Sequence, residues 1–235
     1  PILLSTHNPD VFYIGSNKLH KSKKQYKNFQ AISPDLTHGG KQGDVSYGTL
    51  ASISESRINK RLLYTGSDDG LIYCSRNSGK NWDRISDSLP QNLWVKEVLA
   101  SRNSENKVYA VLNGHTWDHY ESYLYSSKNN GETWRKIGTN LPCISINTII
   151  EDPYQSDILY LGTDAGVYLS TDNGQTFSVM TDLPIVPVHD LAIQETKRDL
   201  IVATHGRSLY KVQLEPVYLY KRYQDSALAL LPIAS

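Results

Sequence analysis

The amino-acid sequence predicts an all-β fold built from units of four short antiparallel strands, and three observations lead to it. A turn phrase recurs as SRNSGKNW at 75–82, SKNNGETW at 127–134 and STDNGQTF at 170–177. A strand-like phrase precedes each copy, as in NKRLLYTGSDDG at 59–70 and QSDILYLGTDAG at 155–166. The repeat length of roughly 40 to 55 residues is typical of β-propeller blades.

The clearest unit predicts four strands, at about 147–151, 158–163, 166–170 and 177–180. These segments are rich in Val, Ile, Leu and Tyr and are separated by Gly, Asn, Asp and Pro. A degraded turn phrase, SKKQYKNF, lies at 22–29, and a fifth strand phrase at 197–208 has no turn phrase after it. We therefore predict four whole blades and a partial fifth, expected to form part of a larger propeller. The predicted blades span about 1–37, 46–90, 93–142, 145–184 and 187–215, and the tail 216–235 either completes the last blade or lies outside the repeat.

Composition excludes several classes of protein. The 24 basic residues balance the 24 acidic residues, so nothing suggests a nucleic-acid partner, which would need a basic stripe. The sequence has no apolar run near 18 residues, so no membrane span is expected. It begins at Pro1 without a methionine, and we expect the true N-terminus, with any signal peptide, to be missing. Cys74 and Cys143 lack metal-ligand spacing and are interpreted as small buried hydrophobic residues, with a disulfide as the alternative.

The turn phrase resembles the Asp-box, Ser-x-Asp-x-Gly-x-Thr-Trp, of the BNR-repeat families. These include sialidases, sortilin-type propellers, xyloglucan-cleaving glycosidases and a photosystem assembly factor. Four longer segments resemble the large bacterial sortilin-like (VPS10-type) proteins labelled "glycosyl hydrolase, BNR repeat". These segments are GSDDG, GHTWDHYESYLYSS, PVHDLAI and DLIVATHGRSLY. That resemblance covers about residues 1–215. It implies the later blades of a larger propeller and an extracytoplasmic location, whether secreted, periplasmic or at the cell surface.

The turn phrases are predicted to be structural. Asp172 is expected to accept hydrogen bonds from backbone N–H groups two residues on, while glycine supplies a positive φ and an aromatic ring packs between sheets. Asn77 and Asn129 replace the aspartate, and an amide can accept a hydrogen bond but cannot transfer a proton at neutral pH. A calcium site at 172–174 is the alternative, but it offers too few oxygen ligands. The structural set is Ser75, Asn77, Gly79, Trp82, Ser127, Asn129, Gly131, Trp134, Ser170, Asp172, Gly174 and Phe177.

Strand alternation divides the loops between two faces of the propeller. The turn phrases join the third and fourth strands on one face, and the loops that join strands two and three lie with the inter-blade linkers on the other. The second face carries most of the side chains that can bind a ligand or act as an acid or a base. Loops held on a rigid scaffold commonly carry such functional residues. The predicted ligand-binding residues are His115, Asp118, His119, His189, Asp190, His205 and Arg207.

Each of these residues also has a structural interpretation. His115, Asp118 and His119 place three metal-capable side chains within five residues, but not at the spacing of a defined zinc motif, so no metal is predicted. The loop that carries them is longer than its counterparts, which favours contact with a ligand or partner. His189 and Asp190 begin an innermost strand, where a buried pair can simply satisfy backbone groups. His205 and Arg207 could orient an acidic group or a sugar, or anchor the last blade.

Two functions compete. The first is a binding module for a protein, peptide or glycan, with the missing blades of the parent chain or another subunit as further partners and no cofactor. The second is a glycoside hydrolase, which needs two carboxyl groups across the scissile bond. The candidate catalytic residues are Asp68, Asp69 and Asp164, and aspartate before glycine is also ordinary hairpin chemistry. Protease-type motifs, Gly-x-Ser-x-Gly and His-Glu-x-x-His, are absent from the sequence.

Overall fold

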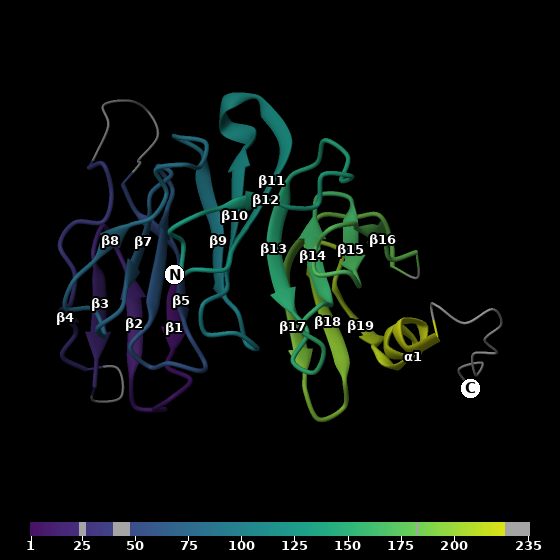
Figure 1. Cartoon of the computed structure of the whole chain (residues 1–235), viewed down its shortest axis with the longest axis horizontal. Helices are drawn as coiled ribbons and strands as arrows, with labels where there is room; N and C mark the ends of the chain where they lie inside the picture. The colour runs from purple at the N-terminus through teal and green to yellow at the C-terminus, as the bar shows by residue number, and fades with distance from the viewer. Residues whose placement is uncertain (24–26, 40–47, 182, 224–235) are drawn as a thin grey trace.

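A computed structural model describes residues 1–23, 27–39, 48–181 and 183–223, and it contains five antiparallel sheets that follow one another along the chain (Figure 1). Four sheets have four strands and the last has three, so the predicted all-β fold of four whole blades and a partial fifth is confirmed. The strands are β1 (Ile2–Leu4), β2 (Phe12–Gly15), β3 (Leu19–Ser22) and β4 (Gln30–Ala31); β5 (Leu50–Glu55), β6 (Leu63–Ser67), β7 (Ile72–Ser75) and β8 (Asp83–Arg84); β9 (Trp94–Ala100), β10 (Val108–Gly114), β11 (His119–Ser127) and β12 (Arg135–Lys136); β13 (Ile146–Glu151), β14 (Leu159–Thr163), β15 (Gly166–Ser170) and β16 (Ser178–Val179); and β17 (Val188–Gln194), β18 (Asp199–Thr204) and β19 (Leu209–Gln213).

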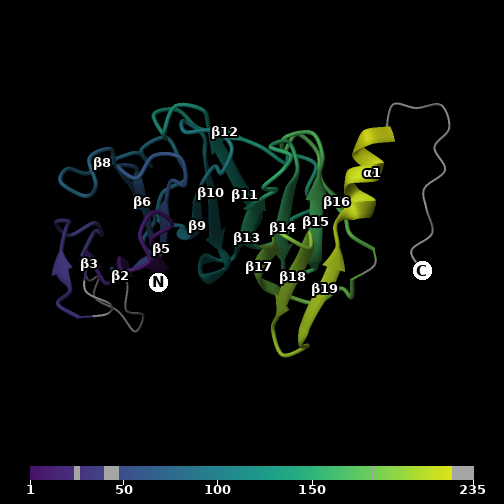
Figure 2. The same ribbon diagram turned by 90° about the horizontal axis from the view of Figure 1, so that it is seen from below.

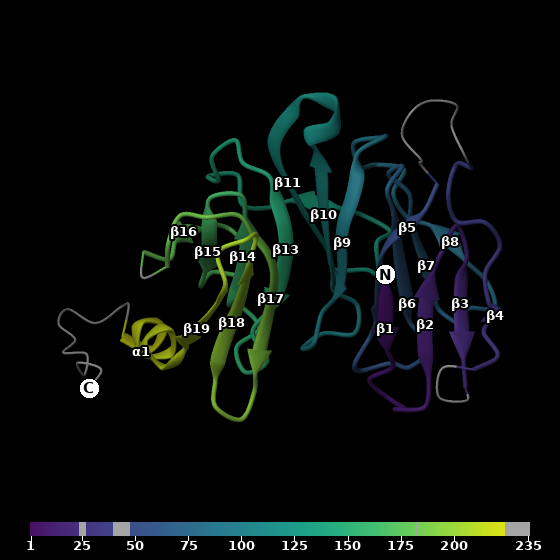
Figure 3. The same ribbon diagram turned by 180° about the vertical axis from the view of Figure 1, so that it is seen from behind.

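The sheets are arranged as blades, which we number one to five in chain order, and they stand side by side along an arc (Figure 2). The first strand of each blade contacts the first strand of the next, so β1, β5, β9, β13 and β17 form the inner side of the arc. The view from behind shows the same succession, with β9 between β5 and β13 (Figure 3). The two-residue strands β4, β8, β12 and β16 form the outer side, as expected for the last strand of a propeller blade.

The core consists of layers of apolar side chains between neighbouring blades. Leu63, Val111, Leu124 and Leu161 are fully buried, because the middle strands of each blade are covered on both faces. A tyrosine recurs in the second strand of the first four blades and is also buried. These are Tyr13, Tyr64, Tyr109 and Tyr160, each at most 1% exposed. Each phenol donates a hydrogen bond, as a buried hydroxyl requires.

The turn phrases fasten each blade to the one before it. A Cβ added to Gly131 would lie 2.3 Å from Cδ1 of Ile85, a residue of the preceding blade, and Gly79 meets Ile32 in the same way. The Trp134 indole N–H donates to the carbonyl of Ile85 at 2.7 Å. The expected ring between sheets and the expected positive φ are confirmed, since Gly131 has a φ of +89°. Glycine therefore suits this position for two reasons, the positive φ of the turn and the close contact with the preceding blade.

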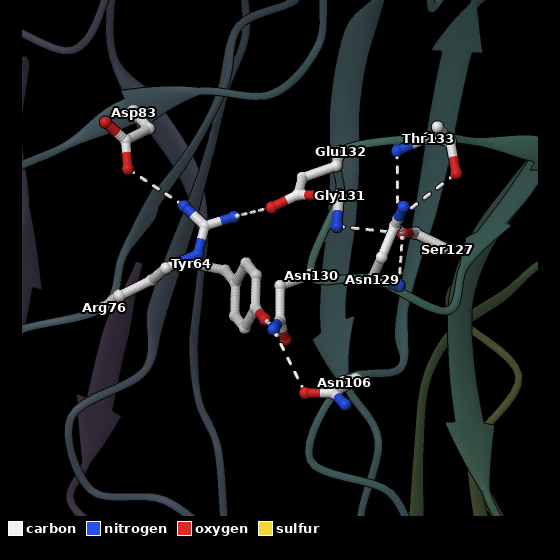
Figure 4. Close-up of polar contacts among 10 residues, drawn as sticks. All are labelled: Tyr64, Arg76, Asp83, Asn106, Ser127, Asn129, Asn130, Gly131, Glu132 and Thr133. Atoms are coloured by element: carbon white, nitrogen blue, oxygen red, sulfur yellow. Dashed lines mark hydrogen bonds and ion pairs between the residues drawn. The ribbon is translucent and has the colours of Figure 1, made fainter.

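The hydrogen bonds inside the turn phrase differ from the prediction. The carboxylate of Asp172 accepts the backbone N–H of Thr176, four residues on rather than two, at 2.9 Å. Asn173 and Gly174 both have positive φ, of 63° and 81°, and these two successive left-handed residues turn the later N–H groups back toward the carboxylate. Asn129 makes the same bond to Thr133 at 2.9 Å (Figure 4), which agrees with the prediction that an amide suffices. The degraded copy at 22–29 lies partly outside the described residues.

The last blade ends in a helix, α1 (Glu215–Tyr223), in place of a turn phrase. Pro216 suits the first turn of a helix, because its missing N–H would have no intrahelical partner there. The N–H of Leu214 donates to the carbonyl of Arg198 at 2.9 Å. Asn130 in the third blade and Asn173 in the fourth make the equivalent bond to the strand 1–2 loop of their own blades. The segment around the start of the helix therefore takes the place of the turn phrase in the last blade. Separately, none of the described helices is long and apolar enough to cross a membrane.

Helix α1 is held by polar and apolar contacts with the fourth blade. Val217 and Tyr218 are buried against Ile158. The Tyr218 hydroxyl donates to Oδ2 of Asp152 at 2.8 Å, and the Lys221 ammonium lies 2.8 Å from Oδ2 of Asp157. Figure 2 shows α1 alongside the fourth blade.

The two cysteines differ from one another. Cys74 is buried, as predicted, and burial raises the pKa of its thiol to about 11. The prediction that Cys143 is buried was wrong, because it lies exposed in the linker that follows the third blade. Both are free thiols in the structure.

Candidate binding face at the mouth of the channel

The strand 2–3 loops and the inter-blade linkers meet at one end of the blades, as predicted. The N–H of Asp164 donates to Ser145 in the linker before its blade, and the N–H of His205 donates to Pro187 in the same manner. Asp164 precedes β15 and Asp172 follows it, so the two residues lie at opposite ends of the sheet. We call the end that carries Asp164 the mouth face and the other end the turn face.

A β-bulge occurs at the mouth end of the first strand in four of the blades. The register skips one residue between Val111↔Glu97 and Leu112↔Val95, which leaves Lys96 as the extra residue of β9. The same shift leaves one extra residue in β5, β13 and β17, and these are Ala51, Asn147 and His189. A bulge re-aims a side chain without ending the strand. The mouth is therefore edged by four residues that are not constrained by ladder pairing.

The long hairpin of the third blade contains a 3-10 turn, η1 (His115–Trp117), which projects from the mouth end of the blade (Figure 1). Asp118 ends it in the left-handed conformation, with a φ of 58°. The His115 ring stacks edge-on against Tyr120 at 5.1 Å between centroids, and the Tyr120 hydroxyl donates to Asp118. His119 Nδ1 lies 3.3 Å from the Tyr123 hydroxyl. The polar groups of this hairpin are engaged with its own aromatic rings.

In the fifth blade the structure brings two predicted residues together. The rings of His189 and His205 lie 5.0 Å apart at a tilt of 35°. Asp190 follows on β17, and its Oδ1 accepts the N–H of Leu191. Both His189 and Asp190 are exposed, and Arg207 is an exposed residue of the adjoining strand 2–3 loop. The described residues contain no group of three His, Cys, Asp or Glu side chains placed to hold a metal ion.

The candidate catalytic aspartates lie in two different blades, with Asp68 and Asp69 in the second and Asp164 in the fourth. Asp68 and Asp164 occupy corresponding loops of the second and fourth blades. Asp68 Oδ1 accepts the N–H groups of Gly48 and Thr49, at 2.9 and 3.0 Å. Asp69 is 3% exposed and accepts from Ser67 and from the N–H of His38. Apart from the bond between Ser67 and Asp69, these bonds tie the loop to the segment that precedes the second blade.

Further residues at the mouth were missed at the sequence level. Trp94 is 38% exposed at the start of β9, and the Lys96 ammonium lies 3.9 Å from the centre of its ring. Asn147 donates to Asp164 Oδ1 at 2.8 Å and to the carbonyl of Val188 at 3.0 Å, so it joins the fourth and fifth blades. An aromatic residue at the end of the DSLPQNLW linker was the available signal for Trp94. The bulges left no signal in the sequence.

Glu97, also missed, lies on the inner side of β9. Its carboxylate accepts the N–H of Ile149 on β13 at 2.7 Å. Ser52 and Ser54 of β5 serve two N–H groups of β9 in the same way, so side chains of one inner strand satisfy the backbone of the next. Burial, opposed by hydrogen bonds from Ile149 and Thr148 and reinforced by the charge of Asp190, raises the pKa of Glu97 to about 7. This carboxyl borders a cavity of about 370 Å³ along the inner strands.

Comparison with known proteins places this arrangement among propellers. Residues 122–221 match the family model described as "Sortilin, neurotensin receptor 3". A xyloglucanase of Hypocrea jecorina (strain QM6a) is 30% identical over 149 residues, which cover 63% of this chain and 16% of that protein. An oligoxyloglucan-reducing end-specific xyloglucanase of Emericella nidulans is 25% identical over 174 residues, covering 69% of this chain and 20% of that protein.

A solved structure gives the same fold. The GH74 xyloglucanase from Xanthomonas campestris superimposes with a TM-score of 0.70 at 13% identity, over 90% of this chain and 36% of that chain. At this level of identity the likeness shows the propeller fold alone. The chain spans 16% and 20% of the lengths of the two curated relatives. The resemblance to BNR-repeat propellers carrying glycosyl hydrolase labels is thus supported.

Proposed function

We propose that this chain is an extracytoplasmic propeller module that binds a glycan across the mouth face. The observation that carries the proposal is the edge of bulge residues Lys96, Asn147 and His189 beside the exposed indole of Trp94. An aromatic ring offers an apolar surface to the C–H face of a sugar, while amide, imidazole and ammonium groups bond its hydroxyls. The similarity to xyloglucanases supports a xyloglucan-type glycan as the ligand class.

The surface suits an extended ligand. Trp117 and Tyr120 of the third-blade hairpin are 49% and 48% exposed, and they stand at the same end as Trp94. His205 lies at the far side, against His189. A chain of several sugars could thus contact the third, fourth and fifth blades together.

Calorimetric titration with a xyloglucan oligosaccharide tests the proposal. Trp94→Ala and His189→Ala are each expected to weaken binding by about tenfold, because each removes a contact worth roughly 1 to 2 kcal/mol. Tyr154→Ala is the matched control, since Tyr154 is 52% exposed but belongs to the turn face. Equal affinity for the wild type and Trp94→Ala would contradict the proposal, as would equal losses in all three variants.

Glycoside hydrolysis is the second candidate function, and the environment of Glu97 favours it. The Glu97 carboxyl has a pKa raised to about 7, and Asp190 lies close enough for its charge to contribute to that rise, so two carboxyl groups stand near one another. Turnover of the same oligosaccharide by the wild type, with losses of about 100-fold in kcat for Glu97→Gln and Asp190→Asn, would support this assignment. Asp68→Asn and Asp164→Asn test the sequence-based alternative. If the wild-type protein binds the oligosaccharide but does not hydrolyse it, the binding function is supported and the hydrolase function is excluded.

A further inference from the structure

A second cavity, of about 710 Å³, lies on the outer rim of the propeller, away from the channel. It lies between the outer strand β12 of the third blade and the turn phrase of the fourth. Its lining includes Lys128, Arg135 and Lys136, together with Thr133, Asn173 and Gln175. Three cations thus border one hollow, and no carboxylate lines it.

The cations are poorly neutralised. Within the described part of the chain, no carboxylate oxygen lies within 4.0 Å of the Lys128 ammonium or the Arg135 guanidinium. Lys136 has one partner, Glu121, at 3.6 Å. The nearest turn-phrase carboxylate, Asp172, accepts hydrogen bonds from Ser170 and Thr176 and does not line the cavity. The hollow therefore carries a net positive charge.

The chain contains its own comparison, because the preceding pair of blades forms the corresponding groove of about 330 Å³. There Arg76 stands in the position of Lys128, and it bonds Asp83 at 2.9 Å and Glu132 at 3.5 Å (Figure 4). Arg84, in the position of Lys136, bonds Asp87 at 2.7 Å. The acid Asp83 corresponds to Arg135, and the acid Glu132 corresponds to Gln175. One groove is internally paired, whereas the other has Arg135, Thr139 and Gln175 in place of Asp83, Asp87 and Glu132.

We propose that the groove between the third and fourth blades is a binding site for an acidic oligosaccharide, with carboxylate or sulfate groups held by Lys128, Arg135 and Lys136. Arginine binds such planar or branched anions through paired N–H donors, and clustered cations of one sign attract them from solution. The amides of Asn173 and Gln175 and the hydroxyl of Thr133 provide the neutral donors and acceptors that sugar hydroxyls require.

An acidic peptide fits the groove less well. Peptides bind extended edges by strand addition or anchor apolar side chains in pockets. The edge strand here, β12, has two residues, which is short for strand addition, and the lining combines Trp134 and Ile137 with the three cations and the hydroxyl and amide groups. The site is also independent of the mouth face, because the turn phrases lie at the opposite end of the blades.

Calorimetric titration of the 235-residue chain tests the site with four probes. These are a galacturonic acid tetramer, a sulfated tetrasaccharide, neutral cellotetraose and hexaglutamate. We expect at least one acidic saccharide to bind, and Arg135→Asp, which restores the acid found at Asp83, to weaken it at least tenfold. Arg84→Asp is the matched control, because it makes the same change of charge in the paired groove, and it is expected to change affinity less than twofold. Thermal melting of each variant verifies the fold, and both substituted residues lie on exposed two-residue strands.

The outcomes separate the possibilities. Whichever of the two acidic saccharides binds more tightly shows whether the site prefers carboxylate or sulfate groups, and either result supports the proposal. Absence of binding by both acidic saccharides would overturn it, as would equal losses in Arg135→Asp and Arg84→Asp, which would show only general attraction between charges. Hexaglutamate that binds as tightly, with the same dependence on Arg135, would overturn it in favour of an acidic peptide site.

Discussion

The phenol of Tyr109 and the carboxylate of Glu151 join the third and fourth blades through a buried hydrogen bond of 3.0 Å. The same carboxylate accepts from the Ser101 hydroxyl and from the N–H of Arg102. Two blades earlier, Glu55 accepts from Tyr13 at 3.1 Å and from Ser5 at 2.8 Å. A buried glutamate thus links alternate pairs of blades, and its desolvation is offset by several donors.

Tyr109→Phe should lower the free energy of unfolding by about 1.5 to 3 kcal/mol, because it removes one donor from a buried carboxylate. Equilibrium urea unfolding measures the change. Tyr168→Phe is the control, since the Tyr168 hydroxyl makes no hydrogen bond within the described residues, and its expected change is below about 0.5 kcal/mol. Equal effects of the two substitutions would show that the bond contributes nothing to stability.

Glu97 should make stability depend on pH between about 4.5 and 7. Its pKa is raised from 4.5 to about 7 in the folded protein, so its contribution is complete below the unfolded pKa and is lost as the pH rises through the folded pKa. Glu97→Gln keeps an acceptor for the N–H of Ile149 but cannot ionise. The free energy of unfolding of Glu97→Gln minus that of the wild type should therefore increase by about 2 to 3 kcal/mol from pH 4.5 to pH 8. Urea unfolding across this range tests it, and a constant difference would be contrary to expectation.

The turn phrase should tolerate an amide but not a methyl group at position 172. Asp172→Ala removes the acceptor for Thr176 and Ser170 and should cost about 1 to 2 kcal/mol of unfolding free energy. Asp172→Asn should cost less than about half of that amount, because Asn77 and Asn129 accept the same bonds in the other blades. Urea unfolding of both variants at neutral pH provides the comparison. If asparagine were as costly as alanine, the charge of Asp172 would be what matters.

The fold was predictable because its signals are local and repeated. Glycine, aspartate and tryptophan in the turn phrase report backbone conformation directly, and short segments rich in Val, Ile, Leu and Tyr report the strands between them. The mouth loops were predictable for the same reason, since strand direction decides which end of a blade each loop occupies. Helix α1 was missed because it is short and because Val217 and Tyr218 are buried only against another blade.

The candidate site was predictable only in part. The exposed residues His189, Asp190 and His205 were identified, and two of them do meet. The bulge at Lys96 depends on how β9 pairs with β10, and the raised pKa of Glu97 depends on the burial of its carboxyl. Neither relationship is encoded in a neighbouring stretch of sequence. The pairing of Arg76 with Asp83 and Glu132 likewise spans two blades, so the contrast between the two outer grooves emerges only in three dimensions.

In four of the blades, the innermost strand contains one extra residue that lies outside the pairing of its own sheet. Because Ala51, Lys96, Asn147 and His189 take no partner in the ladder of their own sheet, exchanging one of them leaves the strand register in place. Related propellers could therefore acquire new ligands by combinatorial substitution at four equivalent positions, each varied independently of the others, while the same scaffold is retained.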